Sequence, residues 1–151
     1  MARKFPLQPL QELAQNNLDT AERHLQKLAD QTRQAEEKLQ QLEGFRGEYQ
    51  QRLQQSTAQG MHALMWRDYQ AFLGKLDAAI AQQSQEVERC RARWEAGRQQ
   101  WLARRQRSRA FDTLAERHQS AENQREDRRE QKETDEFAAK SHARRKPDPG
   151  H

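Results

Sequence analysis

The chain contains no proline between Pro9 and Pro147, and apolar residues recur through that stretch at alternating intervals of three and four positions. Proline is the strongest breaker of helices, and this alternation is the period of a coiled coil. The pattern is interrupted once, between Ser56 and Gly60. The sequence therefore predicts an all-α fold: a long two-helix antiparallel coiled-coil hairpin with an extended, partly frayed C-terminal helix.

Weak helix formers and a glycine at the interruption suit a tight connection between two helices. We expect a single hairpin domain over residues 1–140, with helices at about 6–55 and 62–138, a turn at about 56–61 and a disordered tail at 141–151. The alternative is a continuous helix through Gly60, which would pair with a second chain as a long dimeric spacer.

The composition suits a narrow seam better than a thick core. Hydrophobic residues make up 33% of the chain, charged residues another 33%, and the mean hydropathy is -1.37. A two-stranded coiled coil buries only two of every seven positions, so it tolerates such polarity. The chain lacks a long apolar run or a secretion signal, and its single cysteine is Cys90, which together favour the cytoplasm.

Two heptad arrays describe the apolar pattern. The first has Leu18, Leu25, Thr32, Leu39, Arg46 and Leu53 at a, and Ala21, Leu28, Ala35, Leu42, Tyr49 and Ser56 at d. The second has Trp66, Leu73, Ile80, Val87, Trp94, Trp101, Ser108 and Ala115 at a, and Tyr69, Leu76, Gln83, Cys90, Gly97, Arg104, Phe111 and His118 at d.

Matching of large to small and polar to polar residues across the seam predicts the register. It pairs Leu28 with Val87 and Leu25 with Cys90. A shift of one heptad would place Thr32 on Cys90 and looks less complementary. In the preferred register, residues from about 112 onward have no mate in the first helix.

Apolar residues outside the a and d positions indicate contact surfaces, because a thin rod cannot hide them. Near the turn they combine with seam residues into one semi-exposed strip, formed by Leu42, Phe45, Tyr49, Phe72, Leu76 and Ala79. The alternative is that the aromatic residues only widen the seam locally. At the open end, a mixed apolar and basic set comprises Phe5, Leu7, Leu10, Leu13, Trp101, Arg104, Arg105 and Phe111. Its alternative is a ragged helix start.

Basic residues concentrate between residues 89 and 109, where eight arginines accompany one acidic residue, Glu95. Such a segment suits an acidic partner or nucleic acid, although arginine is also a good helix former on a solvated face. We find no phosphate-binding loop, metal-ligand cluster or catalytic set. The sequence therefore predicts a protein that is not an enzyme and needs no cofactor or metal.

The order of several motifs resembles the flagellar type III export stalk protein, the FliJ family. The motifs are Phe5-x-Leu7-x-x-Leu10, Glu48-Tyr49, Tyr69-x-x-Phe72-Leu73 with Leu76, Ala79 and Ile80, Trp101 with its arginines, and the tail from Arg129 to Ala138. The resemblance covers nearly the full length. It implies an antiparallel coiled coil like part of a rotary ATPase central stalk, which works in the cytoplasm, peripherally at the inner-membrane export apparatus.

The resemblance also implies partners and surfaces. The strip would contact the cytoplasmic domain of the membrane export gate, with Lys38 and Gln83 at its margin. The open end would sit in the hexameric ring of the export ATPase, and export chaperones would be further partners. The alternatives are the equivalent stalk of a non-flagellar type III secretion system and a basic coiled coil that binds nucleic acid.

Overall fold

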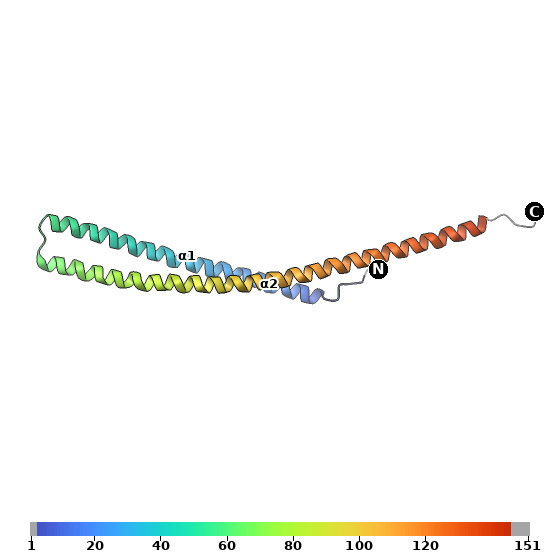
Figure 1. Ribbon diagram of the computed structural model, residues 1–151, viewed down its shortest axis with the longest axis horizontal. Coiled ribbons are helices and arrows are strands. Elements are labelled where there is room, and N and C mark those ends of the chain that lie inside the picture. The colour runs from blue at the N-terminus through green and yellow to red at the C-terminus, as the bar shows by residue number, and fades with distance from the viewer. Residues whose placement is uncertain (1–2, 146–151) are drawn as a thin grey trace, which may run out of the picture. The chain divides into compact units, whose positions relative to one another are not determined.

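The computed structural model describes residues 3–145, and in that range it contains two long helices and no strand. Helix α1 runs over Gln8–Ala58 and helix α2 over Ala63–Arg145, joined by a short connection (Figure 1). The contacts divide the chain into two compact units. One is Leu18–Arg104, and the other joins the described residues up to Asn17 with those from Arg105 onward.

In the unit Leu18–Arg104, α1 and α2 pack against each other in opposite directions, which confirms the predicted hairpin and excludes a continuous helix through the turn. The buried and half-buried residues of α1 in this unit fall on the predicted a and d positions, from Leu18 to Ser56, except for Glu36, which is half-buried beside Arg91 of α2. The most buried apolar side chains of the unit are Leu28, Ala35, Leu53, Leu73, Val87 and Cys90. The seam is thus one layer of side chains deep, as the composition predicted.

Gly60 ends the first helix. Its φ is +87°, a conformation that favours glycine, and its N–H donates to the carbonyl oxygen of Thr57 at 3.2 Å. This is the position and bonding of a glycine just beyond a helix C-terminus. The hydroxyl of Thr57 also donates to the carbonyl oxygen of Leu53, so Ser56 to Ala58 remain helical rather than forming the turn.

The later turn shifts the register by one heptad, and our predicted register is wrong. Val87 and Cys90 pack with Ala35, one heptad beyond Leu28. A Cβ added to Gly97 would lie 2.5 Å from Leu28 Cδ1 and 3.7 Å from Leu25 Cδ1. In the observed register Thr32 therefore shares a layer with Cys90, the pairing that complementarity had disfavoured.

The second unit joins the N-terminal residues to the middle of α2. The ring centroids of Phe5 and His118 lie 5.5 Å apart, and Ser108 donates a hydrogen bond to Gln15. Glu122 is 8% exposed and accepts a hydrogen bond from the backbone N–H of Arg3 at 3.3 Å. The expectation that residues beyond about 112 lack a mate is therefore wrong, which follows from the same heptad shift.

Beyond Glu122, helix α2 continues with exposed side chains through Lys140 and ends at Arg145, later than the expected end near residue 138. Residues 141–145 of the predicted disordered tail are helical, and the rest of that tail lies outside the described residues. Within residues 3–145 neither helix has a stretch apolar enough to cross a bilayer.

Candidate protein-binding surfaces

The predicted strip lies near the turn of the hairpin, where both helices contribute to it. The Tyr49 ring lies against Phe72, with centroids 4.5 Å apart, and near Tyr69, with centroids 6.4 Å apart. The guanidinium of Arg52 lies 5.5 Å from the centroid of the Tyr49 ring. The tyrosine thus connects α1 to α2 at the centre of the strip.

The six residues of the strip differ in how far their side chains are exposed: two are exposed and four are half-buried. Phe45 is 51% exposed and Phe72 is 40% exposed. The other members are half-buried: Leu42, Tyr49, Leu76 and Ala79. The two phenylalanines therefore present apolar surface that the seam does not use. We call the six residues the aromatic strip.

Small residues and one ion pair surround the aromatic strip. A Cβ added to Gly44, Gly47 or Gly74 would meet nothing within 4 Å, so the helix backbone is open to solvent there. Arg46 occupies an a position and pairs with Asp77 across the hairpin. This ion pair raises the pKa of the Arg46 guanidinium through its hydrogen bond and charge attraction to Asp77. It satisfies a cation that would otherwise interrupt the apolar seam.

Three exposed apolar residues at the start of α2 were not among the predicted contact surfaces. Leu64 is 63% exposed, Met65 is 55% exposed, and Trp66, which we had placed on the seam, is 46% exposed. Three consecutive apolar residues cannot all face one partner helix, because the seam has a period of 3.5. This run of three apolar residues was the sequence feature from which their exposure could have been predicted. Leu114 and Phe137 are exposed as well, at 41% and 73%.

The predicted open-end set is divided between the two units. Phe5, Leu7, Leu10, Leu13, Arg105 and Phe111 belong to the unit that contains the N-terminal residues, whereas Trp101 and Arg104 belong to the unit Leu18–Arg104. Three leucines are exposed: Leu7 at 37%, Leu10 at 44% and Leu13 at 54%. Phe5, Arg105 and Phe111 are half-buried in the same unit.

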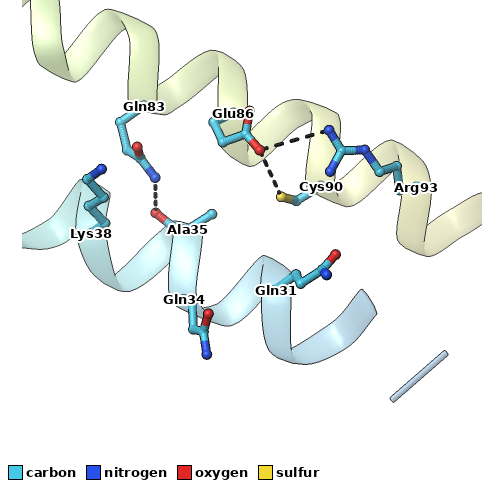
Figure 2. A pocket seen from close by; sticks show the side chains of 8 residues that line it. All are labelled: Gln31, Gln34, Ala35, Lys38, Gln83, Glu86, Cys90 and Arg93. Atoms are coloured by element: carbon cyan, nitrogen blue, oxygen red, sulfur yellow. Dashed lines mark hydrogen bonds and ion pairs between the residues drawn. The ribbon is translucent and has the colours of Figure 1, made fainter. Parts of the chain in front are cut away.

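Midway along the hairpin, a shallow polar groove of about 360 Å³ lies between the helices (Figure 2). In the groove Glu86 forms an ion pair with Arg93 and accepts a hydrogen bond from the Cys90 thiol, and it also pairs with Arg89, which lies outside the groove. The hydrogen bond from Arg89 is the main reason why the pKa of Glu86 is lowered. Burial, followed by the hydrogen bond with Glu86, raises the pKa of Cys90.

Gln83 lies at the edge of this groove but is not a surface residue. It is 9% exposed, and its Nε2 donates to the carbonyl oxygen of Ala35 at 2.9 Å. Lys38 beside it is exposed. Of the two residues that the resemblance implied at the margin of the strip, only Lys38 is exposed.

Several arginines of the basic stretch are already paired with acidic residues. Arg91 bonds Glu36 across the hairpin, and Arg89 and Arg98 pair with Glu86 and Glu95 one turn earlier on α2. Such pairs lower the density of positive charge that nucleic acid would meet. The described residues also hold no group of three or more potential metal ligands. The exposed apolar side chains near the turn and near the N-terminus therefore suit contacts with other proteins.

Comparisons with known proteins agree with the motif order. The profile of the family described as Flagellar FliJ protein matches residues 3–147. A curated relative named Flagellar FliJ protein, from Escherichia coli strain K12, is 33% identical over 98% of this chain and 100% of its own length. A second with the same name, from Salmonella typhi, is 32% identical over the same shares of both chains.

Proposed function

Because the chain belongs to the flagellar FliJ protein family, we propose that it acts in flagellar protein export as a non-enzymatic stalk. The stalk promotes assembly and activity of the hexameric export ATPase and couples that ring to the membrane export gate. The observation that carries the proposal is that the predicted seam positions of α1 are covered in the hairpin, yet two sets of apolar side chains stay exposed. One set lies near the turn, and the other lies among the N-terminal residues of the second unit.

The seam accounts for the fold without these residues. The a and d positions of α1 in the hairpin are buried or half-buried, from Leu18 to Ser56. Exposed aromatic residues such as Phe45 therefore add little to folding. Large apolar side chains that stay exposed on a monomer commonly mark protein-binding sites.

We assign the aromatic strip to the cytoplasmic domain of the export gate. Phe45 and Phe72 would be its anchors, since both combine an aromatic ring with large exposure. The open backbone at Gly44, Gly47 and Gly74 would let a partner approach closely. Tyr49 would hold the two halves of the strip together through its ring contact with Phe72.

We assign the N-terminal apolar residues to the ATPase ring. Leu7, Leu10 and Leu13 are exposed near the start of α1, and Arg105 contributes positive charge within the same unit. Trp101 and Arg104, which the resemblance also implied, remain candidates in the other unit. We further propose that the protein escorts export chaperones and works at the cytoplasmic face of the inner membrane.

The stalk role is tested by measuring the ATPase rate and the hexamer population of the purified export ATPase with and without this protein. A ligand that binds only the assembled ring shifts the equilibrium toward hexamer, so both quantities should rise together. Leu10→Asp with Leu13→Asp should abolish the rise, because charge replaces the exposed leucines. Glu22→Gln on an exposed face of α1 is the control. An unchanged rate together with an unchanged hexamer population refutes the role.

A further inference from the structure

We propose that the hairpin Leu18–Arg104 is a two-register element. It slides by one heptad between the observed register and a second one, and the aromatic strip is assembled only in the observed register.

Two seam positions are mismatched in the observed register. Gln83 is 9% exposed on a d position of the seam, and its amide donates a hydrogen bond to the carbonyl oxygen of Ala35 (Figure 2). Trp66 is 46% exposed although it lies on an a position, because the observed register gives it only Ser56, in the last turn of α1, as a layer partner. The exposed indole disfavours this seam. The hydrogen bond to Ala35 satisfies the buried amide of Gln83, so its mismatch is only that a polar side chain stands in a layer with apolar ones.

A displacement of one heptad removes both mismatches and keeps all a and d positions on the seam. It would place Gln83 in the layer of Thr32, a polar residue opposite another polar residue. It would place Leu39 with Leu76, and Trp66 with Tyr49. The apolar content of the central layers therefore rises in the second register.

The layers around Gly97 and the two tryptophans, Trp94 and Trp101, also remain filled after a displacement of one heptad. In the observed register Leu25 and Leu28 fill the space above Gly97. Leu18 lies one heptad before Leu25 and would fill that space in the second register. In the observed register Trp101 shares a layer with Ala21. Trp94 lies one heptad before Trp101 and would take this place in the second register. Leucine and tryptophan repeat at heptad spacing, so both registers fill the glycine gap.

The turn sets which register dominates. The observed connection uses Gly60 at φ +87° just beyond α1. In the second register the connection moves to the weak helix formers Ser56 to Gln59, and Gly60 enters α2. Glycine is unfavourable inside a helix, and Leu53, buried in the observed register, would face His62. The second register is therefore the minor state.

The displacement changes the aromatic strip directly. Tyr49 lies against Phe72 in the observed register. One heptad corresponds to about 10 Å along the helix axis, at 1.5 Å per residue. The α2 half of the strip would move by that distance relative to the α1 half, so the contact between Tyr49 and Phe72 breaks.

Cysteine cross-linking tests the two registers in the isolated protein. Cys90 is the only cysteine of the chain, so each added cysteine allows one intramolecular disulfide. Thr32→Cys reports the observed register and Leu25→Cys the second one. Asp30→Cys, which places a cysteine on the outer face of α1, measures the background.

We expect Thr32→Cys to cross-link quickly. Leu25→Cys should cross-link at about 1–10% of that rate, as befits a minor state, and faster than Asp30→Cys. If Leu25→Cys is no faster than Asp30→Cys, the proposal is wrong. Products of two chains are separated by mass and excluded from the rates.

Because Leu25→Cys changes a seam residue, a second measurement uses surface positions. Spin labels at Glu37→Cys and Gln99→Cys, both exposed, are attached in a Cys90→Ala chain. Two registers predict a second distance population, longer than the first by somewhat less than about 10 Å. A single population at all temperatures below unfolding contradicts the proposal.

The regulatory meaning rests on the proposed function. If the gate binds the aromatic strip, it binds only one register, and the register is then the variable through which the two ends of the hairpin communicate. The cross-linking and distance measurements use the isolated chain. They can therefore fail while the gate contact stands, or succeed while it fails.

Discussion

The side-chain amide of Gln83 donates a hydrogen bond to the backbone carbonyl oxygen of Ala35 across the hairpin, at 2.9 Å. Both residues are buried, so this bond is a polar contact inside the seam. Buried polar residues in coiled coils commonly specify register and reduce stability.

Gln83 should therefore be more important for specificity than for stability. We expect Gln83→Leu to leave the free energy of unfolding unchanged or slightly higher, because an apolar side chain suits the surrounding seam. Gln83→Ala should lower it by about 1–3 kcal/mol through a lost contact and a cavity. Urea denaturation followed by circular dichroism measures both. Equal losses for the two variants would contradict a specificity role.

Gly97 should be the glycine least tolerant of a side chain. A Cβ there would lie 2.5 Å from Leu28 Cδ1, whereas one at Gly44 would meet nothing within 4 Å. We expect Gly97→Leu to lower the free energy of unfolding by about 1–3 kcal/mol, the usual effect of overpacking. Gly44→Leu is the matched control and should raise it, because leucine is the better helix former. The same denaturation assay applies, and similar effects at both sites would refute the observed packing.

Phe72 and its neighbour Leu73 should separate binding from folding. Leu73 is 7% exposed and Phe72 is 40% exposed. Leu73→Ala should cost about 2–4 kcal/mol of stability, as is typical of a buried leucine. Phe72→Ala should cost much less but weaken binding to the gate domain at least tenfold, which titration calorimetry measures. If Phe72→Ala destabilises the hairpin as much as Leu73→Ala, the ring is core and the strip is a local widening of the seam.

Acid should remove the contribution of Glu86. Its hydrogen bond with Arg89 lowers the pKa of Glu86 in the folded state, so the stabilisation is present above the ordinary glutamate pKa and is lost as pH falls through the folded value. Arg93, Cys90 and, from α1, Lys38 are the other titratable or charged groups at this site. Melting temperatures of the native chain and Glu86→Gln should differ at pH 7 and converge below about pH 4. A constant difference would contradict the assignment.

High pH should lower the stability of the hairpin through Cys90. Burial raises the pKa of its thiol, so the folded state holds the proton more tightly than the unfolded state. Stability associated with the thiol is complete below the ordinary cysteine pKa of about 8.5 and declines as pH rises above it. We expect the melting temperature of the native chain to fall more steeply between pH 8.5 and 10 than that of Cys90→Ala, which serves as the control. Parallel curves would contradict this reading.

The heptad pattern predicts which face of each helix is buried, and the structure confirms this for α1 from Leu18 to Ser56, whereas Trp66 and Arg104 on the predicted seam of α2 are exposed. It does not determine the offset between the helices, because a shift of seven residues preserves all a and d positions. The offset depends on where the chain turns, and Gly60 places the turn later than composition suggested.

For the candidate surfaces too, the heptad pattern predicts some exposed residues, while others depend on the offset between the helices. The exposure of Phe45 and Phe72 followed from their positions outside the a and d pattern. The exposure of Trp66 did not, because it depends on the register and on α1 ending at Ala58. Partner identities came from the family resemblance, and the binding residues remain predictions.

We propose that the chain binds two partners through separate surfaces, one in each of its two units. The most direct measurement uses two double variants. The strip variant carries Phe45→Ala together with Phe72→Ala, and the leucine variant carries Leu10→Asp together with Leu13→Asp. Both are measured for gate-domain affinity and for stimulation of the export ATPase. The strip variant should lose gate binding and keep ATPase stimulation, whereas the leucine variant should do the reverse. Loss of both activities in each variant, or of neither, would contradict the account.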